Sequence, residues 1–166
     1  ATVTLSDNRV VGDVLTTSYT NAAFVNKNVG TAKTITVSGI AISGTDASNY
    51  TANTSVTSTA DITARSLNVT ATGSNKVYDG TPTATVTLAD DRLAGDSFTA
   101  SYTSASFADK NVGTARSVSV SGISVSGTDA GNYTANSSAS ATANITAKGL
   151  TVSGVTSANK VYDANT

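Results

Sequence analysis

The chain has 166 residues, and its 10 basic and 11 acidic side chains give a net charge of -1. It has no Cys, His, Met or Trp, and only 13% of its residues are charged. Without Cys or His it cannot form a disulfide, and it lacks a thiolate nucleophile, an imidazole base and the usual zinc ligands. Near-neutral charge argues against a nucleic-acid surface, and no apolar run approaches the roughly 20 residues of a membrane-spanning helix. We therefore expect neither an enzyme, nor nucleic-acid binding, nor membrane insertion.

An internal repeat dominates the sequence. Residues 1–70 align without a gap to residues 84–153, with 43 identities. A third copy starts near the end, where the residues of 75–81 return at 159–165 with one residue inserted before them. A period of about 83 residues suits a small β domain better than a solenoid coil. The predicted domains are a first repeat at 1–65 that lacks its first strand, a complete repeat at 66–148, and the first strand of a third repeat at 149–166.

The complete repeat alternates apolar and polar residues in short runs, as strands do. Val, Ile and Thr dominate, and no stretch has helical periodicity. The pattern predicts an all-β chain of tandem Ig-like (Greek-key) β-sandwich repeats of about 83 residues in an extended array. A β-grasp unit is the alternative, and the lack of a helical segment counts against it. The expected strands are 67–71, 84–88, 98–102, 105–107, 118–125 with a bulge or bend at Gly122, 133–139 and 141–147.

A tyrosine follows an aspartate by four residues near the end of each repeat. These pairs are Asp129 with Tyr133 and Asp46 with Tyr50. The spacing resembles the tyrosine corner of immunoglobulin domains, in which the hydroxyl binds nearby backbone. The cysteines and the core Trp of antibody domains are absent. We therefore expect a structural role for these four residues in an Ig-like sandwich.

The segment Lys76-Val77-Tyr78-Asp79-Gly80 is the most distinctive motif of the chain. Asp-Gly is a turn dipeptide, and a tyrosine ring can pack on a sandwich while its hydroxyl stays polar. We therefore expect Tyr78, Asp79 and Gly80 to shape a strand and its turn rather than to bind a ligand.

Three aspartates cluster in the loop 90–96, namely Asp90, Asp91 and Asp96. Together with backbone carbonyls they would offer the oxygens that Ca²⁺ requires. Against this, Arg92 lies inside the loop, and Asp is common in turns for its own hydrogen bonds. We expect no cofactor, and calcium at these three residues is the alternative.

Three spaced segments make the chain similar to a known family. Lys-Val-Tyr-Asp-Gly-Thr at 76–81, Asp-Lys-Asn-Val-Gly-Thr at 109–114 and Gly-Thr-Asp-Ala-Gly-Asn-Tyr at 127–133 resemble the YDG repeat domains. These and the related MBG repeats occur in large bacterial exoproteins of the filamentous-haemagglutinin type. The resemblance implies an extracellular or cell-surface adhesin, often exported by two-partner secretion, whose parent protein contacts a host surface or biofilm polysaccharide.

We therefore expect the repeats to act as a stalk that holds a distal binding region away from the cell, with neighbouring repeats as their partners. In the alternative, the repeats themselves bind carbohydrate or matrix polymer weakly and multivalently. That function needs an exposed aromatic platform, for which the complete repeat offers Tyr102, Tyr133 and Phe107.

The third copy suggests a further hypothesis. Residues 150–163 duplicate a strand that the first repeat lacks, so the tail of one molecule would complete the first repeat of another by head-to-tail strand exchange. In the alternative phase, the repeat boundary lies near residue 83 and Lys-Val-Tyr-Asp is a last strand.

Overall fold

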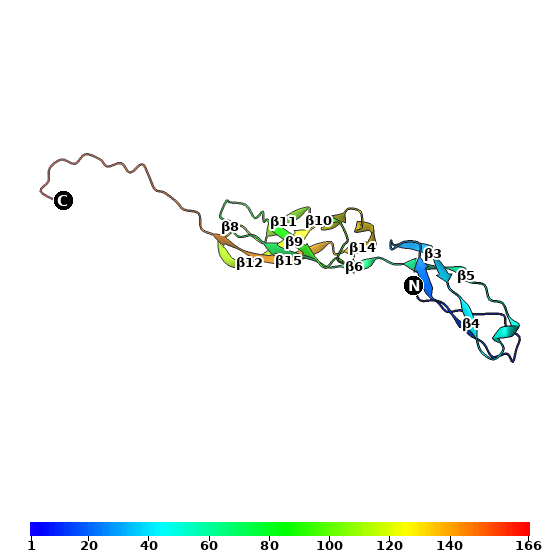
Figure 1. Ribbon diagram of the computed structural model, residues 1–166. Helices are drawn as coiled ribbons and strands as arrows, with labels where there is room; N and C mark the ends of the chain where they lie inside the picture. The colour runs from blue at the N-terminus through cyan, green and yellow to red at the C-terminus, as the bar shows by residue number, and fades with distance from the viewer. The chain divides into compact units, whose positions relative to one another are not determined.

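The computed structural model describes all 166 residues and contains fifteen β-strands and two short 3-10 turns (Figure 1). The predicted all-β class is confirmed. The chain divides into two compact units, which interleave in sequence. Unit 1 contains residues 1–69, 90–101 and 123–137, and unit 2 contains residues 70–89, 102–122 and 138–166.

Unit 1 contains the whole first repeat. Strands β2 (Asn21–Phe24), β3 (Gly30–Ser38) and β5 (Ser55–Ile62) form an antiparallel sheet with β3 in the centre. Strand β1 (Thr16–Ser18) pairs antiparallel with β4 (Ala41–Ser43), and the 3-10 turn η1 (Ala47–Asn49) follows β4.

The remainder of unit 1 comes from the second repeat. Strand β10 (Thr99–Ser101) pairs antiparallel with β13 (Ser124–Ser126). After the 3-10 turn η2 (Ala130–Asn132), β14 (Tyr133–Ala135) pairs in parallel with β6 (Arg65–Leu67). The first strand of the second repeat is therefore held by a segment that lies near the end of the same repeat.

Unit 2 is built on a four-stranded sheet. Its order is β11 (Ser104–Phe107), β12 (Gly113–Ser121), β15 (Ser138–Thr146) and β8 (Lys76–Val77), and β8 runs parallel to β15 (Figure 1). Strand β7 (Val69–Gly73) pairs with β9 (Val86–Asp90). No strand follows β15, and residues 149–161 are all exposed coil.

The elements recur 83 residues apart, as the sequence does. Asn21 faces Ser38 in β2–β3, and their counterparts Ser104 and Ser121 face each other in β11–β12. Each long central strand also carries the same irregularity, where Ala32 and Ala115 take φ values of 47° and 48°. Duplicated sequence has therefore produced the duplicated register.

Gly122 ends a strand that the alternation pattern extends. The predicted strand 118–125 is wrong, because β12 ends at Ser121 and β13 begins at Ser124. Gly122 adopts φ +68°, and a Cβ there would lie 2.3 Å from Thr103 Oγ1. A left-handed residue takes the chain out of one ladder, so β12 pairs with β11 whereas β13 pairs with β10. The predicted boundary between 133–139 and 141–147 is likewise wrong, since β14 ends at Ala135 and β15 runs unbroken from Ser138.

Small and β-branched side chains fill the core of each unit. In unit 2 the fully buried side chains include Val118, Val120 and Ile145, each at 1% exposure or less. In unit 1 the buried apolar residues are Ile35, Val37, Leu67, Val69, Phe98, Ile123 and Tyr133. Only two of these seven, Ile35 and Val37, belong to the first repeat, so that repeat has a much thinner core than the second.

Candidate functional site

The tyrosine near the end of the second repeat fastens a distant loop. The Tyr133 hydroxyl donates to Asp96 Oδ2 at 2.7 Å and accepts the Leu93 N–H at 3.0 Å. Its ring is 7% exposed and lies 5.1 Å from the Phe98 ring. Burial, followed by the bond to Asp96, raises the pKa of Tyr133. As in an immunoglobulin corner the hydroxyl binds backbone, but this backbone lies 40 residues upstream rather than nearby.

The predicted aspartate partner grips the same loop. Asp129 Oδ2 accepts the Ser97 N–H at 2.9 Å, and in the first repeat Asp46 Oδ2 accepts the Val14 N–H at 2.8 Å. Likewise, the Tyr50 hydroxyl donates to Asp13 and accepts the Val10 N–H. Each Asp–Tyr pair therefore clamps the loop that precedes β1 or β10, and it does so twice at the 83-residue spacing.

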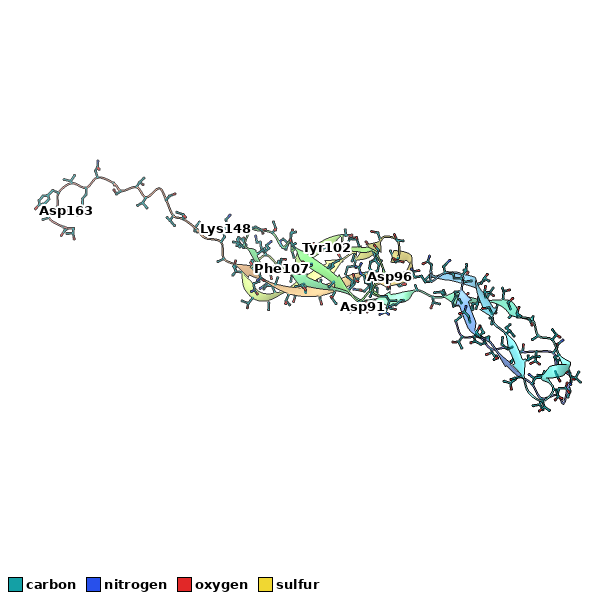
Figure 2. The ribbon with its side chains drawn as sticks, viewed as in Figure 1. Asp91, Asp96, Tyr102, Phe107, Lys148 and Asp163 are labelled. Carbon is teal, nitrogen blue, oxygen red and sulfur yellow. The ribbon has the colours of Figure 1, made fainter.

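The three aspartates of the loop 90–96 face different protein donors. Asp90 forms a two-pronged ion pair with Arg92, with N–O distances of 2.6 and 2.8 Å, and this guanidinium lowers the pKa of Asp90. Asp91 Oδ1 accepts the Asn68 N–H, and Asp96 accepts the Tyr133 hydroxyl (Figure 2). The structure holds no group of three or more acidic, His or Cys residues arranged to bind a metal ion.

The Lys-Val-Tyr-Asp-Gly segment forms a compact turn in unit 2. Asp79 Oδ1 binds Lys76 Nζ at 2.8 Å and accepts both the backbone N–H and the hydroxyl of Thr81 at 2.9 Å. These donors, Lys76 first, lower the pKa of Asp79 to about 2. Gly80 supplies the φ of +84° that the turn requires, and Tyr78 is half-buried. The segment therefore has the strand-and-turn geometry expected from its sequence.

A lysine of the first repeat meets the clamp of the second, a contact that the sequence analysis did not anticipate. Lys27 Nζ lies 2.6 Å from Asp96 Oδ1 and 3.1 Å from Asp129 Oδ1. Two residues later, the Val29 N–H donates to Asn132 Oδ1 at 2.9 Å. Hydrogen bonding to Asp96, then to Asp129, raises the pKa of Lys27. We call Lys27, Val29, Asp96, Asp129 and Asn132 the junction cluster.

The only sequence signal for the junction cluster is that each of its members has a counterpart 83 residues away. Lys27 recurs as Lys110, while Asp13 and Asp46 are the first-repeat copies of the two aspartates. Nothing in one isolated repeat marks the lysine as a bridging group. The structure contains no helix with the length and apolar character that crossing a lipid bilayer requires.

Comparison with known proteins agrees with the motifs. The profile of the YDG domain matches residues 1–59 and again residues 63–143. No curated protein and no solved structure matches the chain. Because the two matched segments together cover most of the sequence, the chain belongs to the YDG domain family.

Proposed function

We propose that this chain is part of a stalk in a secreted or surface-attached bacterial adhesin. In this proposal, Ig-like sandwich repeats of about 83 residues follow one another in an extended array and hold a distal binding region away from the cell. The chain has no catalytic role, and the parent protein supplies the contacts to a host surface or to biofilm polysaccharide. Membership of the YDG family and the in-line duplication support the array.

The observation that carries the proposal is the parallel pairing of early and late strands of one repeat. Lys76 and Val77 of β8 face Ile145 and Thr146 of β15, and the Tyr78 N–H donates to Thr146 O at 2.8 Å. In a parallel pair, tension pulls the start of one strand and the end of the other in opposite directions along the ladder. The bonds are then loaded together in shear instead of opening one after another, which suits an element that carries force.

The junction cluster adds to this argument. Strand β5 ends at Ile62 and β6 begins at Arg65, so only two residues separate the repeats in sequence. Lys27 binds Asp96 and Asp129 across this short connection. A short linker and a side-chain tie favour restricted motion of successive repeats.

Single-molecule stretching of the chain by its two ends tests the stalk. We expect sharp unfolding events, each releasing at most about 270–300 Å of chain for 83 residues. Tyr78→Pro removes the N–H that binds Thr146 O and should lower one unfolding force, whereas Tyr162→Pro, at the exposed counterpart of Tyr78, should not. Extension without distinct force peaks would contradict a load-bearing role.

The carbohydrate-binding alternative needs aromatic rings at the surface. Phe107 and Tyr133 are only 2% and 7% exposed, which leaves Tyr102 as the one half-exposed candidate of the three. The labelled positions in Figure 2 place Phe107 within the stranded part of the chain. A glycan array is the direct test, and saturable binding lost in Tyr102→Ala would favour this alternative over the stalk.

A further inference from the structure

Identical sequence takes two different structures in the two repeats. Tyr-Thr-Ala at 133–135 is strand β14, because it pairs with β6, whereas Tyr-Thr-Ala at 50–52 forms no strand. Val-Thr-Leu-Ala-Asp at 86–90 is strand β9, paired with β7, whereas Val-Thr-Leu-Ser-Asp at 3–7 forms no strand. Composition does not explain the difference. What residues 3–7 and 50–52 lack is the pairing partner that β6 and β7 supply in the second repeat.

An asparagine side chain shows the same difference. Asn136 accepts the Val69 N–H at 2.7 Å through Oδ1 and donates to Val69 O at 3.0 Å through Nδ2. Its counterpart Asn53 instead donates to Ser55 O, two residues along its own chain. The first repeat thus carries an unused clamp for the backbone of an incoming strand.

The first repeat also has an apolar groove beside these segments. A hollow of about 370 Å³ is lined by Val3, Leu5, Ile35, Val37 and Val56, among others. A second hollow of about 200 Å³ continues past Leu5 and Val56 to Leu15, Ile42 and Tyr50. In the second repeat the corresponding apolar strands are accompanied by Leu67 and Val69, which are themselves 3% and 1% exposed.

The occupant with the matching sequence is present in the chain. Leu150 and Val152 are the copies of Leu67 and Val69, and they are 88% and 80% exposed. Further on, Lys160 and Val161 copy Lys76 and Val77 of β8, and this tail also forms no strand. The tail already makes the local turn of the motif, because Lys160 Nζ binds Asp163 at 2.9 Å (Figure 2).

We propose that residues 148–162 of one copy of this chain bind the groove of the first repeat of a second copy as added strands. The register follows from the second repeat. Residues 148–150 pair in parallel with residues 50–52, Asn53 binds the backbone of Val152, and residues 160–161 pair with residues 62–63. One face of the added strand, with Leu150 and Val152, enters the groove. The single inserted residue between the two halves of the tail forms a bulge.

This contact joins two different surfaces of the chain. The tail of each copy is donated and the groove of each copy is filled, so the association is head to tail and continues into chains or closes into rings. The inference does not depend on the proposed stalk, since it concerns self-assembly of the chain through strands that any tandem array of these repeats would share.

Light scattering after size-exclusion chromatography, over a thousandfold range of concentration, tests the proposal. The full chain should form species at whole multiples of the monomer mass. Val152→Asp places a charge in the groove and should abolish them at all concentrations, whereas Thr151→Asp, whose side chain lies on the outer face, should preserve them. Assembly that survives Val152→Asp, or a full chain that stays monomeric throughout, would overturn the proposal.

A peptide of residues 148–163 distinguishes strand addition from nonspecific association. We expect it to bind the Val152→Asp chain, whose own tail cannot compete, and to bring the amides of residues 3–7 and 50–52 into hydrogen-exchange protection. Asn53→Ala should weaken peptide binding at least tenfold while leaving the circular dichroism spectrum of the monomer unchanged. Binding without new protection at these two segments, or equal binding to the Asn53→Ala variant, would refute the register.

Discussion

Replacement of Asn136 by alanine tests how the second repeat holds its first strands. The side chain satisfies both backbone groups of Val69, at 2.7 and 3.0 Å, and Val69 is 1% exposed. A buried backbone group left without a partner costs about 1–3 kcal/mol. Since Asn136→Ala removes the partner of two such groups, and some water will enter, we expect the free energy of unfolding to fall by about 2–4 kcal/mol.

The matched control lies in the identical tetrapeptide Tyr-Thr-Ala-Asn of the first repeat. Asn53 donates only to Ser55 O, in an exposed turn. Asn53→Ala should therefore change the free energy of unfolding by no more than about 0.5 kcal/mol when the chain is dilute. The comparison cancels the effect of sequence and isolates the burial and pairing of the asparagine.

Urea unfolding followed by circular dichroism gives the free energies, and amide hydrogen exchange locates the change. In Asn136→Ala the Val69 amide should exchange faster than in the parent chain, and the amides of β3 should not. Equal destabilisation by Asn136→Ala and Asn53→Ala, or an unchanged exchange rate at Val69, would refute the argument from buried backbone groups.

Three further outcomes are expected. Lys27→Ala should lower the melting temperature more than Lys110→Ala, because Lys27 binds Asp96 and Asp129 whereas its counterpart makes no ion pair. The effect should be largest between the pKa values of the partners: it is lost as pH falls below 3.8, because the pKa of Asp96 is lowered, and lost as pH rises above 10.5, because that of Lys27 is raised. Gly122→Ala should destabilise by about 1–3 kcal/mol through strain at positive φ, and Gly131→Ala, where a Cβ meets nothing, should not. Calorimetry with Ca²⁺ or with a chelator should show the same melting temperature if the loop 90–96 binds no calcium.

Strand content could be predicted from the sequence because it depends on local patterns. The alternation in 84–88 and 105–107 corresponds to β9 and β11 within two residues. The break at Gly122 was placed correctly but was interpreted as a bulge within one strand. Period-two alternation continues through that residue, so only the contact of its backbone with Thr103 shows that the chain leaves one ladder for another.

Pairing partners could not be predicted in the same way. A tyrosine four residues after an aspartate indicated a local corner, yet the Tyr133 hydroxyl binds Leu93 and Asp96, far upstream. The tripeptide at 50–52 and its copy at 133–135 show why, since one sequence is coil or strand depending on a partner elsewhere in the chain. Long-range pairing is a property of the assembled repeat, and the residues being paired do not encode it alone.

The motif that gives the family its character encodes a turn that forms without its sheet. In unit 2, Asp79 gathers Lys76 and Thr81 around Gly80, and β8 pairs with β15. In the tail, Asp163 gathers Lys160 and Asn165 in the same way although no strand adjoins it.

The tail even accepts Ala164 at φ 63°, where glycine stands in the complete repeat, at a cost of about 1–2 kcal/mol. A turn that persists despite that substitution and without a neighbouring strand is stabilised by its own aspartate and lysine. Because the turn is formed beforehand, a strand that carries it loses less conformational entropy when it docks. The motif therefore prepares the first strand of each repeat for pairing, whether the groove that receives it belongs to the same chain or to another copy.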